Sequence, residues 1–308
     1  GDFDQNLALI EQRLSVTATP RGNHLMLKGS ASAVDQARRV LDSLYASLEE
    51  GRSVEIASVD SLIRMVQQED NQLTLPTLEK KGRVRMAQIA TRKATIVART
   101  PAQDAYMRAM ERAELVFGIG PAGTGKTYLA VAHAATLLER GDINRIILSR
   151  PAVEAGERLG FLPGDMKEKV DPYLRPLYDA LYDMMRPEHV ERCITSGVIE
   201  VAPLAFMRGR TLANAVVILD EAQNTTSMQM KMFLTRLGEN SKMIVTGDPS
   251  QIDLPRGEKS GLVEAVNLLE GIEGVHISRF NDKDVVRHAL VGRIVRAYDQ
   301  ASANKTQA

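Results

Sequence analysis

The chain has 308 residues, of which 44% are hydrophobic, so its length suggests about two domains and its composition allows each a core. Lysine and arginine together number 39, as do aspartate and glutamate, which restricts any nucleic-acid-binding surface to a local patch. The single cysteine, Cys193, excludes a disulfide within the chain, and no run of about 18 apolar residues predicts a membrane span. No charged-then-apolar leader opens the sequence, which begins without Met. We therefore expect a protein of the reducing cytoplasm.

Residues 1–50 predict a small domain of their own. Its expected elements are a helix at 6–14, strands at 15–19 and 24–28 around a turn at 20–23, and a helix at 31–49. This αββα order is similar to part of the KH fold, which binds RNA. KH domains grip the RNA backbone through a GXXG loop, and residues 1–50 contain none. An assembly or docking domain is therefore the alternative interpretation.

Residues 51–99 predict a basic connector with a helix at 59–68 and a short strand at 94–97. Between residues 79 and 99 stand seven lysines and arginines against the single acid Glu79: Lys80, Lys81, Arg83, Arg85, Arg92, Lys93 and Arg99. Such a run is usually only a solvated face. Beside a nucleotide-binding domain it is also a candidate contact for RNA phosphates.

From residue 100 to 300 strands alternate with helices, which predicts an α/β domain with a parallel sheet. The expected strands are 114–119, 145–149, 198–201, 216–219, 242–246 and 275–278. The expected helices are 103–112, 126–140, 172–185, 227–236, 260–269 and 284–300. Residues 301–308 predict a polar tail.

Residues 120–127 match the phosphate-binding P-loop pattern G-x-x-x-x-G-K-[ST], between a predicted strand and a predicted helix. Glycines allow backbone N–H groups to curl around a phosphate, and a helix N-terminus favours an anion. In this motif Lys126 reaches the β- and γ-phosphates and Thr127 holds Mg²⁺. The alternative is a glycine-rich turn that binds nothing. The residues expected to bind the nucleotide here are Gly120, Pro121, Ala122, Gly123, Thr124, Gly125, Lys126, Thr127 and Tyr128.

Two further apolar strands end in polar residues, and the carboxyl ends of parallel strands meet at one edge of a sheet. After strand 216–219, Asp220 fits a Mg²⁺ ligand and Glu221 a general base for water. After strand 242–246, Asp248 would link the loop to the metal site. Gln251 would orient water or contact the γ-phosphate. Acidic pairs after strands are common by chance, so this pair indicates a metal site only because the same domain also contains a P-loop.

Gln103 opens the predicted helix that leads into the P-loop strand. Its side-chain amide offers a donor and an acceptor together, which suits adenine N7 and N6. An exposed loop glutamine is the ordinary alternative.

The motifs taken together resemble those of the PhoH-like ATPases. The segments that carry the resemblance are GPAGTGKT, SRPAVEAGERLGFLPGD, ILDEAQN, TGDPSQIDLP and RFNDKDVVRHALVGRIVRAY, within residues 103–298. Residues 1–50 resemble the small domain of the subgroup that lacks a nuclease domain. The resemblance implies a RecA-like P-loop fold, similar to the first half of superfamily 1 helicases. By that similarity the helicase motifs fall on Gln103, Lys126 and Thr127, Arg150, Asp220 and Glu221, and Gln251.

A helicase would add a second RecA-like domain of about 150 residues, and only residues 253–308 follow here. The arginine that such a lobe supplies must come from elsewhere: Arg279 or Arg287 of the same chain, or a neighbouring subunit. The resemblance implies hexameric rings, which favours a neighbouring subunit, and our candidate is Arg287. It also implies work beside a YbeY-type endoribonuclease in RNA or ribosome maturation.

Residues 150–182 form a long insertion, predicted either to contact nucleic acid or to cover the sheet. Its basic candidates are Arg158, Lys167, Lys169 and Arg175. The five histidines and Cys193 lack the spacing of a zinc site.

The sequence as a whole predicts a Mg²⁺-dependent ATP hydrolase that acts on RNA. The alternatives are an ATP-gated scaffold for a nuclease and a small-molecule P-loop kinase. Glu221 argues against the kinase, because a kinase must suppress attack by water.

Overall fold

The computed structural model describes residues 4–22, 24–49, 54, 56–72, 86–151, 166–255 and 257–286. The chain folds into two compact units, Gly1–Ala90 with Thr95–Arg108, and Thr91–Ala94 with Ala109–Ala308. The domain boundaries drawn from the sequence stay predictions.

The first unit begins with the predicted α-β-β-α order. Its elements are α1 (Gln5–Leu14), β1 (Thr17–Arg21), β2 (His24–Lys28) and α2 (Ala31–Glu49). The strands are antiparallel, and β1 runs on through Arg21, which pairs with His24. The hairpin turn is therefore tighter than predicted, with Gly22 at φ 57°.

Helix α3 (Ile56–Gln72) is longer than predicted and belongs to the core of the first unit. Its Val59, Leu62 and Ile63 are buried in one cluster with Ile10 of α1 and Val40 of α2. The segment that the sequence suggested as a connector thus contributes a core helix. Part of its basic stretch, Lys80 to Arg85, lies outside the described residues.

A small hairpin and a helix complete this part of the chain. β3 (Gln88–Ala90) pairs antiparallel with β4 (Thr95–Val97), and α4 (Pro101–Arg112) follows. β4 and α4 were predicted, whereas β3 was missed because three residues show no usable periodicity.

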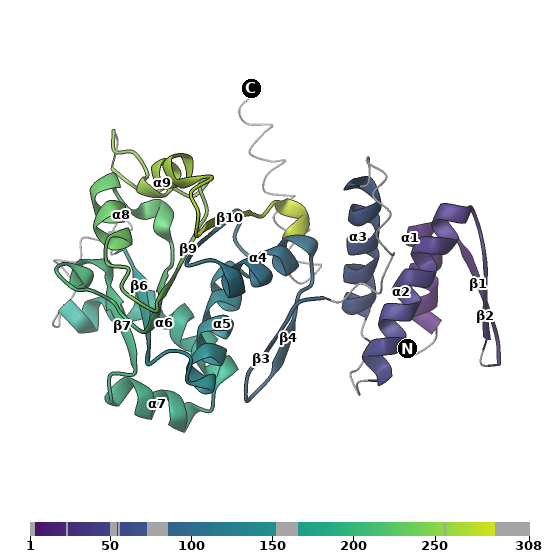
Figure 1. The fold of residues 1–308 in the computed structure, drawn as a ribbon, viewed down its shortest axis with the longest axis horizontal. Helices are drawn as coiled ribbons and strands as arrows, with labels where there is room; N and C mark the ends of the chain where they lie inside the picture. Colours follow the sequence, from purple (N-terminus) through teal and green to yellow (C-terminus); the bar gives the residue numbers. More distant parts are fainter. Residues whose placement is uncertain are drawn as a thin grey trace. The chain divides into compact units, whose positions relative to one another are not determined.

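The second unit is built on a six-stranded parallel sheet, as predicted (Figure 1). The order is β10-β5-β9-β8-β6-β7. The strands are β5 (Leu115–Ile119), β6 (Arg145–Arg150), β7 (Ile199–Pro203), β8 (Ala215–Leu219), β9 (Lys242–Gly247) and β10 (Val275–Arg279). The P-loop strand β5 and the acidic strand β8 are therefore separated by β9.

Alternate residues of the strands serve the two faces of the sheet. Phe117, Val217 and Val245 are buried in one cluster with residues of α8 (Ser227–Leu234) and α9 (Gly261–Leu269). Helices α5 (Lys126–Arg140) and α6 (Met166–Met184) contact the strands as well and also pack together. Strands buried on both faces explain why the sequence shows continuous apolar runs instead of alternation.

Two helical predictions differ from the structure. Helix α7 (Pro187–Thr195) was missed, although Pro187 stands at its first turn, a usual start signal. The helix predicted at 284–300 lies beyond the described residues except for its start, where a 3₁₀ turn, η5, spans Asp282–Asp284. The predicted tail at 301–308 also lies outside them. No helix in the described ranges is long and apolar enough to cross a bilayer.

The buried histidine of α5 makes the stability of the second unit depend on pH. Burial, together with the charges of Lys242 and Arg140, lowers the pKa of His133 to about 4 despite a hydrogen bond to the backbone of Met110. The unfolded chain, with a histidine pKa of about 6.5, binds a proton that the folded chain does not. The contribution of neutral His133 to the free energy of unfolding is therefore fully present above about pH 6.5 and is lost as the pH falls toward the folded pKa.

We predict that His133→Leu flattens this dependence, which amounts to roughly 3 kcal/mol between the two pKa values. The check is the free energy of unfolding at pH 7 and pH 4.5, with the exposed His276→Gln as the control that keeps the parent slope. Equal slopes for His133→Leu and the parent would contradict the assignment.

Candidate functional site

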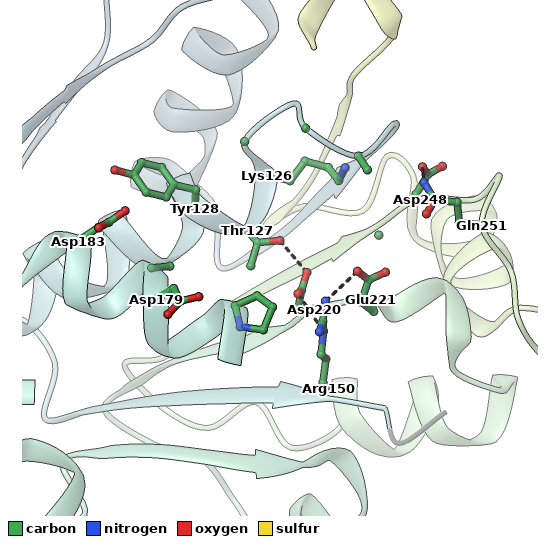
Figure 2. Close-up of a pocket in the computed structure, with 16 residues that line it drawn as sticks. Lys126, Thr127, Tyr128, Arg150, Asp179, Asp183, Asp220, Glu221, Asp248 and Gln251 are labelled. Atoms are coloured by element: carbon green, nitrogen blue, oxygen red, sulfur yellow. Dashed lines mark hydrogen bonds and ion pairs between the residues drawn. The ribbon is translucent and has the colours of Figure 1, made fainter. Parts of the chain in front are cut away.

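A pocket of about 430 Å³ lies at the carboxyl ends of β5, β6, β8 and β9 (Figure 2). Its lining combines the P-loop with Asp220, Glu221 and Gln251, and α6 adds Asp179 and Asp183. The structure thus brings the P-loop and both later motifs into one cavity, at the edge where ligands bind in open α/β sheets.

The P-loop needs glycine at three positions. Gly120, Gly123 and Gly125 have φ of 143°, 85° and 83°, in the region that side chains disfavour. A Cβ on Gly120 would also lie 2.8 Å from the carbonyl carbon of Phe280, the residue after β10. Gly125 caps α5, so the helix N-terminus borders the pocket and its dipole favours an anion there.

Lys126 is held inside the loop. Its Nζ donates to the carbonyl oxygens of Gly120 at 2.6 Å and Pro121 at 2.8 Å, and the residue is buried. The ammonium group of Lys126 is therefore held against the loop that binds phosphate in this motif.

Asp220 is held by residues of three other elements. Its Oδ1 accepts hydrogen bonds from the hydroxyls of Thr127 at 2.6 Å and Thr246 at 2.7 Å. Its Oδ2 lies 3.2 Å from Nε of Arg150. Helix α5, strand β9 and strand β6 thus all contact one buried carboxylate at the end of β8, and Figure 2 shows the contacts from Thr127 and Arg150.

Glu221 is fixed by its backbone and by two donors. Its φ is 53°, which is uncommon for a residue with a side chain. Nη2 of Arg150 donates to Oε1 at 2.8 Å, and Nε2 of Gln223 donates to Oε2 at 2.6 Å. The side chain remains 41% exposed, so its carboxylate can still reach water in the pocket.

Gln223 joins Glu221 to the loop after β9. Its Oε1 accepts from the backbone N–H of Asp248 at 3.0 Å, and its carbonyl accepts from the Ser260 hydroxyl at 2.8 Å. A Cβ on Gly247 would stand 2.9 Å from the same Oε1. The buried amide therefore depends on a glycine beside it.

The loop after β9 presents Asp248 and Gln251. Burial raises the pKa of Asp248, but hydrogen bonds from Ser250 and Gln251, with the charge of Lys126, outweigh it and leave the pKa below its usual value. Nε2 of Gln251 donates to Oδ2 of Asp248 at 2.6 Å, and Gln251 itself is exposed and lines the pocket.

Five predicted residues that the structure describes do not line this cavity: Gly120, Pro121 and Thr124 of the P-loop, and Gln103 and Arg279. Gln103 belongs to the first unit, where its Oε1 accepts from the backbone N–H of Arg99 at 2.7 Å. Arg279 is paired with Glu270 at 2.8 Å in an exposed position. Arg287 lies outside the described residues, as do residues 152–165 of the predicted insertion, which include Arg158.

The contributions of Thr246 and Gln223 were not predicted from the sequence, and Arg150 was assigned only to a motif by resemblance. One signal was available, because each follows or ends an apolar strand run at the same edge as Asp220. The hydrogen bonds themselves depend on the strand order, which the motifs do not reveal.

The donors around Asp220 suit a hard divalent cation. Thr127 and Asp220 offer oxygen, and Mg²⁺ binds through one or two carboxylates completed by substrate phosphates and water. Within the described part of the chain, no group of three or more His, Cys, Asp or Glu side chains could hold a metal alone. A divalent cation held by Thr127 and Asp220 would leave its other coordination positions to phosphate oxygens and water.

We predict that Gln223→Leu lowers the free energy of unfolding by about 1–3 kcal/mol, because it leaves the buried N–H of Asp248 without its acceptor. Equilibrium denaturation measures the loss. The control is Gln251→Leu, an exposed amide with a single described partner, for which a change near 0.5 kcal/mol is typical. Equal losses in the two variants would contradict the bridging role.

Comparison with known proteins places this geometry in a family. Residues 95–299 match the family model described as PhoH-like protein. The chain is 52% identical over 300 residues to a PhoH-like protein of Bacillus subtilis, covering 97% of this chain and 92% of the relative.

Two other relatives differ in coverage. A PhoH-like protein of Mycobacterium tuberculosis is 52% identical over 303 residues, which cover 97% of this chain and 83% of the relative. Protein PhoH of Escherichia coli is 47% identical over 241 residues, which cover 78% of this chain and 68% of the relative. The chain therefore belongs to the PhoH-like protein family, whose nucleotide-binding P-loop it carries.

Proposed function

We propose that the protein is a Mg²⁺-dependent ATP hydrolase. The observation that carries the proposal is the 2.6 Å hydrogen bond from Thr127 to Asp220. It joins the first turn of the P-loop helix to the acid at the end of β8, so one hydroxyl and one carboxylate oxygen stand together beside the phosphate-binding loop.

The P-loop binds the triphosphate in this proposal. The N-terminus of α5 and the ammonium of Lys126 supply the positive potential that the β- and γ-phosphates require. Because Lys126 is already held by two carbonyls of the loop, little side-chain entropy remains to be lost when phosphate binds.

Thr127 and Asp220 hold the cation. A bound Mg²⁺ would neutralise the charge that develops on the phosphate oxygens during transfer. Thr127 can coordinate through a lone pair while its hydrogen still points to Asp220, so the observed contact is compatible with that role.

Glu221 accepts a proton from the attacking water. Its carboxylate is partly exposed in the pocket, and its backbone and Gln223 limit its orientation. Gln251, at the pocket wall, contributes an amide that can position the water or contact the γ-phosphate. Gln103 stays our proposal for adenine recognition.

Release of phosphate from ATP by the full chain, with and without Mg²⁺ and with and without RNA, tests the proposal. Hydrolysis supports it. Nucleotide binding without phosphate release would favour the ATP-gated scaffold, and transfer to an added small molecule would favour a kinase.

The central variant is Glu221→Gln, for which we predict retained ATP binding and a turnover lower by roughly 10²–10⁴, the usual contribution of a general base. Lys126→Ala should instead weaken nucleotide binding itself. The measurements are phosphate release and equilibrium binding of ATP. Hydrolysis by Glu221→Gln at the parent rate would remove Glu221 from this role.

We also propose that hydrolysis is coupled to RNA in an oligomeric ring, beside a YbeY-type endoribonuclease. Two observations support this: the resemblance of the chain to the PhoH-like ATPases, and the exposed basic turn between β3 and β4, which carries Arg92 and Lys93. Phosphate contacts of this kind make affinity fall steeply with salt.

For RNA we predict that the double substitution Arg92→Glu with Lys93→Glu weakens binding and reduces the salt slope by about 2, one for each lost phosphate contact. Binding of a single-stranded RNA is measured between 50 and 200 mM salt. Arg38→Glu, an exposed arginine on α2, is the matched control. An unchanged slope in the double variant would exclude this turn as the contact.

A further inference from the structure

Arg150 is the cation that the structure adds to the predicted site. It is the last residue of β6, and β6 lies beside β8 with Ser149 opposite Leu219. The residues that follow this pair, Arg150 and Asp220, are therefore neighbours across the two strands. Its side chain is only 17% exposed and points into the pocket between the two acids (Figure 2).

The guanidinium forms an ion pair with each of the two acids and donates a hydrogen bond to Glu221. Nε lies 3.2 Å from Asp220 Oδ2, and Nη2 lies 2.8 Å from Glu221 Oε1. The Oδ1 atom of Asp220 already takes two hydroxyl donors. Arg150 thus contacts the remaining oxygen of Asp220 and one oxygen of Glu221. These are the carboxylates to which the proposed function assigns cation binding and proton abstraction, respectively.

These roles conflict with the observed pairing. A guanidinium and a divalent cation that share one carboxylate repel each other strongly at such short range. Arg150 also occupies Oε1 of Glu221, one of the two oxygens with which that carboxylate could accept a proton from water. Asp220 and Glu221 can take up their proposed roles only if Arg150 releases them.

A phosphate within the same pocket is the natural second partner for the released group. Lys126, Arg150 and Glu221 line the same cavity. A γ-phosphate bound between Lys126 and Glu221 would therefore lie in the space that Arg150 borders. The planar fork of arginine matches phosphate oxygens better than a lysine does.

We propose that Arg150 is a cis-acting arginine switch: it pairs with Asp220 and Glu221 as seen here, and it turns to the γ-phosphate of the nucleotide on its own chain. The inference rests on the proposed function for the identity of the ligand. In turning, Arg150 frees Asp220 for the cation and Glu221 for water. It also supplies the positive charge that was expected from Arg279, Arg287 or another subunit.

A purely structural ion pair is the competing account, and the chain contains one for comparison. Arg210 makes a fork of two hydrogen bonds to Glu200, at 2.6 and 2.7 Å, and neither residue lines the pocket. Arg210→Ala therefore serves as the control for the general effect of losing a fork-like arginine pair.

The first test measures binding, not turnover. In the presence of Mg²⁺, the affinities of ADP and of adenylyl-imidodiphosphate, a triphosphate analogue that resists hydrolysis, are compared in the parent, Arg150→Ala and Arg210→Ala. Removing the switch should tighten ADP binding, because no ion pair must be broken. It should also reduce the preference for the triphosphate, because the contact with the γ-phosphate is lost.

We predict that both changes are about tenfold in Arg150→Ala, as for loss of a hydrogen bond to a charged group, and that Arg210→Ala shows neither. Absence of either change in Arg150→Ala overturns the proposal. Failure of the parent to bind either nucleotide would instead remove the proposed function. If Arg150→Ala does not fold, Arg150→Lys must show the same two changes to a smaller extent, since it keeps the charge without the fork.

The second test asks whether the arginine acts in cis. Turnover of Arg150→Ala should fall by about 10³ or more, the range of catalytic arginines in phosphoryl transfer. Mixing it with Lys126→Ala subunits should restore nothing, because each nucleotide needs both residues from one chain. Recovery of phosphate release in the mixture would show that the arginine acts across subunits and overturn the cis assignment.

Discussion

The carboxylate of Asp220 is the point on which the site depends. It is buried, and burial of a charge is costly unless donors surround it. Two hydroxyl donors, Thr127 on α5 and Thr246 on β9, and the cation of Arg150 on β6 surround it from three separate elements. The sheet order makes this possible, because β9 and β6 flank β8 on its two sides. Sheet, P-loop and acid are therefore one arrangement, and a change in strand order would dismantle the site.

A second constraint keeps Glu221 ready beside Asp220. The left-handed backbone of Glu221 costs energy, and such strain persists only where the surroundings fix it. Gln223 provides that support by holding both the carboxylate of Glu221 and the backbone of Asp248. The loops after β8 and β9 are thus connected through one buried amide. Preorganised groups of this kind lose little free energy to reorientation during a reaction.

The sequence was sufficient for the elements and for the motifs, because continuous apolar strands and the glycine pattern of a P-loop are local signals. All six strands of the parallel sheet were predicted, and α5 was predicted with its observed bounds. What failed was non-local. The core role of α3 depends on packing against α1 and α2, and the bonds of Arg150, Thr246 and Gln223 depend on which strands are neighbours. Short elements such as β3 carry too few residues to show a period.

The central claim is that Asp220 and Thr127 bind a cation together with nucleotide phosphates. Titration of Mg²⁺ against the complex with a triphosphate analogue, in the parent and in Asp220→Asn, tests it most directly. An amide keeps the shape and can still accept from Thr127 but carries no charge. The account predicts that nucleotide affinity in the parent rises with Mg²⁺ and that Asp220→Asn loses most of this dependence, by tenfold or more for a charged partner. An equal dependence on Mg²⁺ in the two proteins would contradict it.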